Sequence, residues 1–140
     1  MKLATKYLLF PAFFLFISLS GFAQGEPCKA KETASKLIEG YTFLKNYQID
    51  KTTEEVEYSY VFSNNTTYIL AMANKEGNAN NVIVEILDSN KKLIASNYNK
   101  KTDKYYPAVV FPCKSTGIYY LKFTFKERPD CFASVLGFKK

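Results

Sequence analysis

Apolar and polar residues change their spacing once along this chain, from a helical period to the period of a β-strand. In residues 28–44 apolar side chains recur every three or four positions, as on one face of an amphipathic helix. Pro27 precedes them at a position where a first-turn proline is tolerated, and Gly40 weakens the far end. Residues 46–55 are polar. The pattern therefore predicts one N-terminal helix followed by a loop.

From residue 56 onward the apolar period is two, and clusters of Asn, Asp, Ser and Gly separate the apolar runs. Short strands at roughly ten-residue spacing are typical of an antiparallel sandwich or barrel. No strand alternates with a helix, which disfavours a parallel sheet. We therefore expect a mainly β protein, a jelly-roll-like antiparallel β-sandwich preceded by one amphipathic N-terminal helix. The sandwich should have about seven strands, at residues 56–62, 67–73, 82–87, 92–98, 105–111, 118–125 and 131–138.

Residues 1–23 have the three-part layout of a secretory signal peptide. Lys2 and Lys6 provide a positive start, an apolar run covers residues 7–19, and small residues precede a predicted cleavage after Ala23. The run is about 13 residues long, short of the roughly 20 that a membrane-spanning helix needs. A retained anchor is the alternative, whereas a lipoprotein is disfavoured because Glu26-Pro27 precedes the first cysteine. The sequence predicts export to the periplasm or beyond, with no transmembrane segment after cleavage.

Cleavage would leave 117 of the 140 residues as a mildly basic chain. The segment removed contains two lysines and no acidic residue, so the net charge falls from +6 to +4. Residues 24–55 are expected to form the helix and loop and residues 56–140 the sandwich core, together one globular domain over 24–140. Lysines are scattered, with internal doublets only at residues 91–92 and 100–101. The charge pattern and the predicted export both argue against nucleic acid as a partner.

Three cysteines, Cys28, Cys113 and Cys131, remain after cleavage. In an oxidising compartment at least one disulfide is expected, and the odd count leaves one thiol free or paired in a disulfide-linked dimer. A strand over residues 118–125 would hold Cys113 and Cys131 roughly 25 Å apart, against the ~6 Å between Cα atoms that a disulfide needs. Cys28 is therefore expected to pair with Cys113 or with Cys131. The chain has no histidine and no Cys-x-x-Cys motif, so no metal site is predicted.

The residue inventory also limits the catalytic chemistry. Without histidine, the usual Ser-His-Asp and Cys-His arrangements are excluded, and no catalytic residue or cofactor is predicted. Paired carboxylates could still serve a glycoside hydrolase, which is kept as an alternative beside a structural or assembly role in the cell envelope. Asp88 has a simpler role, because an aspartate at a hairpin turn caps its own backbone. The other candidate carboxylates are expected at the surface: Glu54, Glu55, Glu57 and Glu85.

Tyrosine is the abundant residue type most open to a binding role. Tyrosines suit half-buried sheet surfaces, but a flat set of rings can also bind sugars or a protein partner. Tyr105, Tyr106, Tyr119 and Tyr120 form the two adjacent pairs proposed for such contacts. Adjacent residues on a strand point to opposite faces, so at most one of each pair should lie in the core.

The second half of the chain carries a series of family-like motifs. It contains Thr67-Tyr68-Ile69-Leu70, then the hairpin sequence of residues 82–90 with Asp88 in its turn, and later Thr116-Gly117 leading into Tyr119. Over about residues 56–138 the chain resembles the bacterial pre-peptidase C-terminal domain, and it is similar to small exported bacterial proteins that carry such a domain alone. The N-terminal helix and the cysteines are not part of that pattern. The resemblance implies a β-sandwich outside the cytoplasm that binds a protein or glycan partner without catalysis.

Overall fold

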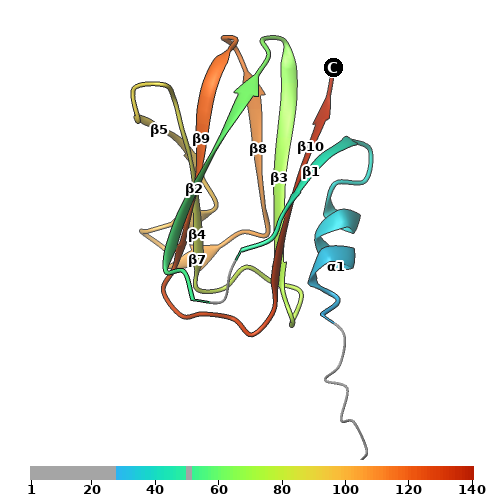
Figure 1. The fold of residues 1–140 in the computed structure, drawn as a ribbon, viewed down its shortest axis with the longest axis vertical. Coiled ribbons are helices and arrows are strands. Elements are labelled where there is room, and N and C mark those ends of the chain that lie inside the picture. The colour runs from blue at the N-terminus through green and yellow to red at the C-terminus, as the bar shows by residue number, and fades with distance from the viewer. Residues whose placement is uncertain (1–27, 50–51) are drawn as a thin grey trace, which may run out of the picture.

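Two four-stranded antiparallel sheets face each other in the computed structural model, which describes residues 28–49 and 52–140 (Figure 1). The predicted signal peptide lies outside the described residues. One sheet has the strand order β1-β10-β3-β8 and the other β2-β9-β4-β5, while β6 and β7 form a separate two-stranded ribbon. The elements in chain order are α1 (Ala30–Leu37), β1 (Thr42–Tyr47), β2 (Glu55–Phe62), β3 (Thr66–Asn74), β4 (Val82–Leu87), β5 (Leu93–Ser96), β6 (Tyr98–Asn99), β7 (Lys104–Tyr105), β8 (Ala108–Cys113), β9 (Gly117–Phe125) and β10 (Phe132–Lys139).

This arrangement confirms the predicted mainly β, antiparallel sandwich preceded by one N-terminal helix, although the helix is shorter than predicted. The described residues form ten strands rather than about seven, for two reasons. The predicted strand 92–98 is split into β5 and β6, and the predicted strand 105–111 into β7 and β8. In addition, β1 forms where a helix and the start of a loop were predicted.

The predicted helix over residues 28–44 is wrong beyond Leu37. Ala30, Ala34 and Ile38 do face one sheet at helical spacing, and they pack on small residues of β3 and β10. The helix then ends, and Gly40 adopts a left-handed conformation with φ +86° that turns the chain back. The following segment, β1, pairs antiparallel with β10 along the edge of the sheet. Leu44 therefore packs against the core between the sheets, not on a helix face.

The core between the sheets is rich in aromatic rings. Phe62 is fully buried, and its ring stacks on Tyr68 with 4.0 Å between centroids and on Tyr119 with 5.2 Å. Tyr47 and Phe123 extend this cluster toward the other end, 5.9 Å apart. The tyrosine content noted in the sequence thus serves packing in large part, since rings of this size bury extensive apolar surface.

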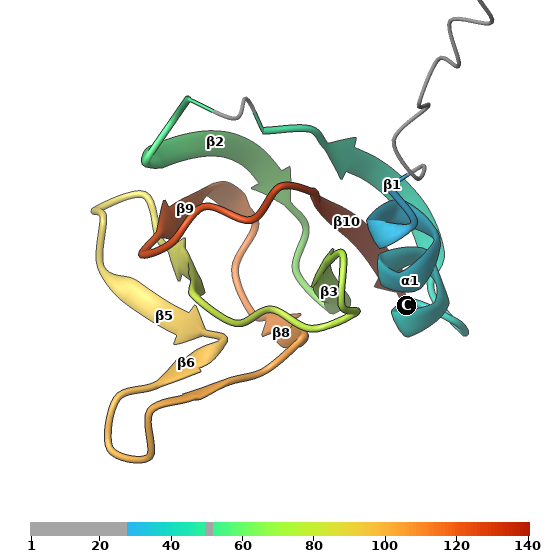
Figure 2. The same cartoon turned by 90° about the horizontal axis from the view of Figure 1, so that it is seen from below.

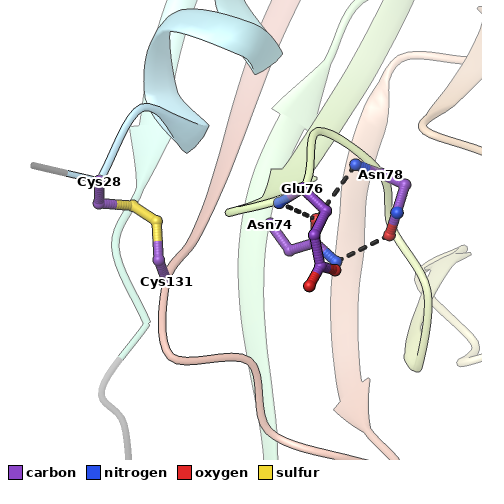
Figure 3. The surroundings of a disulfide bond; sticks show 5 residues. All are labelled: Cys28, Asn74, Glu76, Asn78 and Cys131. Atoms are coloured by element: carbon purple, nitrogen blue, oxygen red, sulfur yellow. Dashed lines mark hydrogen bonds between the residues drawn. A yellow bond between two sulfur atoms is a disulfide. The ribbon is translucent and has the colours of Figure 1, made fainter. Parts of the chain in front are cut away.

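A disulfide joins Cys28, before α1, to Cys131, before β10, with 5.8 Å between the Cα atoms. Figure 3 shows it near a turn in which Asn74 accepts hydrogen bonds from the backbone N–H groups of Glu76 and Asn78. This is one of the two pairings that the sequence left open. The sequence left the odd cysteine either free or paired between molecules, and in the structure Cys113 is a buried free thiol.

Within the described part of the chain, no helix has the length and apolar character needed to cross a membrane.

Candidate functional site

The β6–β7 ribbon forms a hairpin that extends away from the sandwich (Figure 2). Its cross-strand pairs are Tyr98 with Tyr105 and Asn99 with Lys104. Residues of the turn itself hold its conformation. The side-chain oxygen of Asn99 accepts the backbone N–H of Lys101 at 3.0 Å, and Asp103 takes a left-handed conformation with φ +50° that aspartate tolerates. The turn residues are therefore held by local hydrogen bonds although they lie outside both sheets.

Asn97 anchors this hairpin to the sandwich. Its side chain is only 1% exposed, and its oxygen accepts the backbone N–H of Val84 at 2.7 Å. Its amide nitrogen donates to the carbonyls of Val82 at 3.0 Å and Tyr106 at 3.2 Å. The Tyr106 N–H also donates to the Asn97 carbonyl at 2.8 Å. One buried amide thus ties both ends of the hairpin to β4, and no apolar side chain could replace it.

On one side of the hairpin two tyrosine rings are held together under a lysine. The rings of Tyr98 and Tyr105 lie 4.7 Å apart, and the Lys126 ammonium lies 4.4 Å from the centroid of Tyr98. The Tyr98 hydroxyl donates to Asp103 at 2.8 Å. This hydrogen bond raises the pKa of Tyr98, while contact with the hydroxyls of Tyr105 and Tyr98 raises the pKa of Lys126. Lys126 therefore stays positively charged in neutral solution.

Tyr106 lies in a different environment, next to an open hollow of about 560 Å³. It is 42% exposed, and the Lys104 ammonium lies 5.0 Å from its ring centroid. We call this space the hairpin hollow; it is a shallow depression that is wide open to solvent. Its lining combines rings, ammonium groups, a hydroxyl and an amide: Ser96, Tyr98, Asn99, Lys100, Lys101 and Tyr106.

The four tyrosines proposed from the sequence lie in different surroundings in the structure. Tyr105 and Tyr106 both belong to the hairpin, whereas Tyr119 lies in the core and donates its hydroxyl hydrogen to the Ser115 carbonyl at 2.7 Å. Tyr119 is only 7% exposed, so it has no free ring face and leaves the set of candidate binding residues. Tyr120 points to the opposite face, as strand alternation requires.

Sequence reasoning missed three residues that shape the site. Asn97 and Tyr98 fall at the end of the strand predicted over residues 92–98, and Lys126 lies between two predicted strands; the sequence assigns none of the three a role in binding. The Asn-Tyr-Asn-Lys-Lys run of residues 97–101 indicates a turn, but nothing in it distinguishes the buried asparagine from the exposed one.

Three of the carboxylates considered for glycoside hydrolysis, Glu55, Glu57 and Asp88, have other partners. Glu57 forms an ion pair with Lys91, and Glu55 forms one with Lys122 at 3.2 Å. Asp88 accepts the backbone N–H groups two and four residues further on, both at 2.9 Å, which is the turn-capping role expected for it. Over residues 28–49 and 52–140, no three His, Cys, Asp or Glu side chains gather closely enough to hold a metal ion.

A second hollow of about 410 Å³ lies beside the disulfide and is lined by Phe125 and Phe132 among other residues. Its Phe125 is covered by the Arg128 guanidinium, 4.7 Å from the ring centroid, and Arg128 also donates to the Thr53 carbonyl. The Asn46 side-chain oxygen and the Arg128 Nε are buried there without a hydrogen-bond partner among the described residues. The hairpin hollow, with its exposed tyrosine and lysines, is the better candidate.

No protein-family model matches this chain, and no curated protein matches it in sequence. The resemblance to the pre-peptidase C-terminal domain therefore stays a prediction, and the case for a function depends on the hairpin.

Proposed function

We propose that this protein is an exported, non-catalytic β-sandwich module that binds a glycan through the hairpin hollow. The observation that carries the proposal is the exposed Tyr106 beside a hollow that is also lined by the polar residues Ser96 and Asn99. A tyrosine ring offers an apolar face to the C–H groups of a sugar, while hydroxyl and amide groups can exchange hydrogen bonds with sugar hydroxyls. Both kinds of contact are needed to hold a sugar ring in one orientation.

The carboxylates support a binding role over a hydrolytic one. Glycoside hydrolases use two carboxyl groups about 5–9.5 Å apart on either side of the scissile bond. The residues that line the hairpin hollow include no carboxylate. Glu55 and Glu57 point outward from β2 and are paired with lysines. A bound sugar in the hollow would therefore meet rings and ammonium groups but no acid–base pair.

The proposal is tested by glycan-array screening of the mature, oxidised protein, followed by calorimetric titration of the best ligands. Tyr106→Ala should weaken binding by about fivefold or more, since an aromatic contact is worth roughly 1 kcal/mol beyond its buried area. Tyr106→Phe should keep most of the affinity because it keeps the ring. Tyr120→Ala, which removes a ring from the outer face of β9 that does not line the hollow, is the matched control and should leave binding unchanged. Equal affinities for Tyr106→Ala and the unsubstituted protein would show that the hollow is not the glycan site.

A protein partner is the second candidate, favoured by a different surface. Val61 and Ile118 are direct cross-strand neighbours on β2 and β9, and they are 60% and 48% exposed. Exposed apolar pairs of this kind can mark a contact with another protein. If the double substitution Val61→Thr/Ile118→Thr abolished capture of an envelope protein while glycan binding was absent, this second function would replace the first.

A further inference from the structure

The hairpin carries positive charge that its own residues do not neutralise. Lys100, Lys101 and Lys104 form no ion pair among the described residues. The only carboxylate of the hairpin, Asp103, accepts the Tyr98 hydroxyl. The outer face of the β2-β9-β4-β5 sheet differs, because its lysines pair with the glutamates of β2. Uncompensated like charges repel each other, and an anionic ligand would relieve that repulsion.

These positively charged lysines lie near the exposed ring of Tyr106. Lys100 and Lys101 line the same hollow as Tyr106, and the Lys104 ammonium lies 5.0 Å from the Tyr106 centroid. A sugar stacked on this ring would bring its ring substituents close to these lysines. The carboxylate of a uronic acid is such a substituent.

We propose that the glycan bound at the hairpin hollow is acidic, a polyuronate whose carboxylates pair with Lys100 and Lys101. This inference rests on the proposed glycan-binding function and adds the charge of the ligand to it. Two lysines that line one hollow favour a polymer that carries a carboxylate on each sugar over a neutral chain, because opposite charges across a contact attract.

Single-stranded nucleic acid is the other polymer that combines negative charge with stacking. It binds to sites where successive bases stack on successive exposed rings. Here the rings of Tyr98 and Tyr105 lie 4.7 Å apart in a tilted arrangement under Lys126, and Tyr106 is the most exposed of the three hairpin rings. One ring and a short row of lysines fit a sugar unit with its carboxylate better than a run of bases.

The test compares polyuronates with the same polymers after methyl esterification, which removes the charge and keeps the sugar. Oligomers of polygalacturonate and of alginate, their methyl esters and an oligothymidylate of equal charge are titrated into the mature, oxidised protein. The acids should bind at least about tenfold more tightly than the esters at about 50 mM salt, and this preference should shrink at about 300 mM salt through screening.

Lysine variants then test which residues cause the preference for the acids over the esters. Lys100→Gln/Lys101→Gln should remove most of the preference for acid over ester and leave ester binding unchanged. Lys36→Gln/Lys114→Gln removes two exposed lysines elsewhere, from α1 and from the turn after β8, and should preserve the preference. Circular dichroism of each variant checks that the fold is intact.

The outcomes separate this inference from the function on which it rests. Equal binding of acid and ester, with loss of both in Tyr106→Ala, would overturn the acidic ligand and leave the glycan-binding function standing. Oligothymidylate binding as tight as polyuronate binding would overturn the inference in favour of a nucleic-acid site. If neither these polymers nor any glycan on the array bound in a Tyr106-dependent way, both proposals would be refuted.

Discussion

Replacing Asn97 by alanine should destabilise the sandwich as well as loosen the hairpin, because one buried side chain serves three backbone groups. Two of its hydrogen bonds, to the N–H of Val84 and the carbonyl of Val82, are fully buried, and the third, to Tyr106, is partly buried. Each such bond is worth roughly 1 kcal/mol net, and a buried group left without a partner costs about 1–3 kcal/mol. The expected loss in the free energy of unfolding is therefore about 3 kcal/mol.

Urea unfolding with the disulfide intact measures this loss, provided that the slope of unfolding free energy against urea is unchanged. Asn99→Ala is the matched control. Its side chain is exposed and accepts two backbone N–H groups of the turn, so its removal should cost about 1 kcal/mol or less. Asn97→Asp should be at least as damaging as alanine at neutral pH, since it keeps the acceptor but loses both donors and buries a charge. A change within about 1 kcal/mol for Asn97→Ala would refute the role of this residue as the anchor.

Three further predictions concern the cysteines and the core. Cys28→Ser/Cys131→Ser should lower the free energy of unfolding by up to about 4.7 kcal/mol, because the disulfide spans 103 positions and this is the loop-entropy value for roughly 100 residues. Thermal melts without reductant would measure the loss. An unchanged melting temperature would contradict the prediction. Tyr47→Phe should be neutral or stabilising by about 1 kcal/mol at pH 7, because the buried Tyr47 hydroxyl has no hydrogen-bond partner among the described residues. Burial raises the pKa of Tyr47, so Tyr47 ionises first in the unfolded chain, and the free energy of unfolding falls as the pH rises above about 10. Urea unfolding at pH 7 and pH 10.5 should show that this free energy falls less for Tyr47→Phe than for the unsubstituted protein. Equal falls in the two proteins would rule this out. Cys113 should react with a thiol reagent only in denaturant, one thiol per chain, and fast labelling of the native protein would contradict its burial.

The first part of the fold shows why a helical pattern was extended too far. The spacing of Ala30, Ala34 and Ile38 continues numerically to Tyr41 and Leu44, so periodicity alone favours one long helix. The local signal against it was Gly40, a preferred residue just past a helix end, followed by strand-forming residues. What periodicity could not supply is the pairing of β1 with β10, about 90 positions away in the chain. A contact at that distance decides the conformation of the segment against its local pattern.

The adjacent tyrosines show a similar limit. Strand alternation correctly indicated that only one of Tyr119 and Tyr120 could be in the core, but not which one. The choice depends on which face of β9 meets the other sheet. Tyr60 lies opposite Tyr119 in the register, and Phe62 stacks on the ring from the same inner face. That information belongs to the pairing of two strands and is absent from either one alone.

The hairpin, by contrast, had a readable signal in Pro107. A proline lacks an N–H and restricts the residue before it to extended conformations, so it interrupts a continuous strand. The single strand predicted over residues 105–111 is broken at this point, where the Pro107 carbonyl accepts the N–H of Met72 at 2.8 Å and β8 begins one residue later. The break separates Tyr105, which packs on Tyr98, from the core strand, and it leaves Tyr106 at the junction with 42% of its surface exposed. The proline therefore helps to place the exposed ring on which the proposed binding site depends, and Pro107→Ala should shift the hairpin and weaken glycan binding while the aromatic core stays folded.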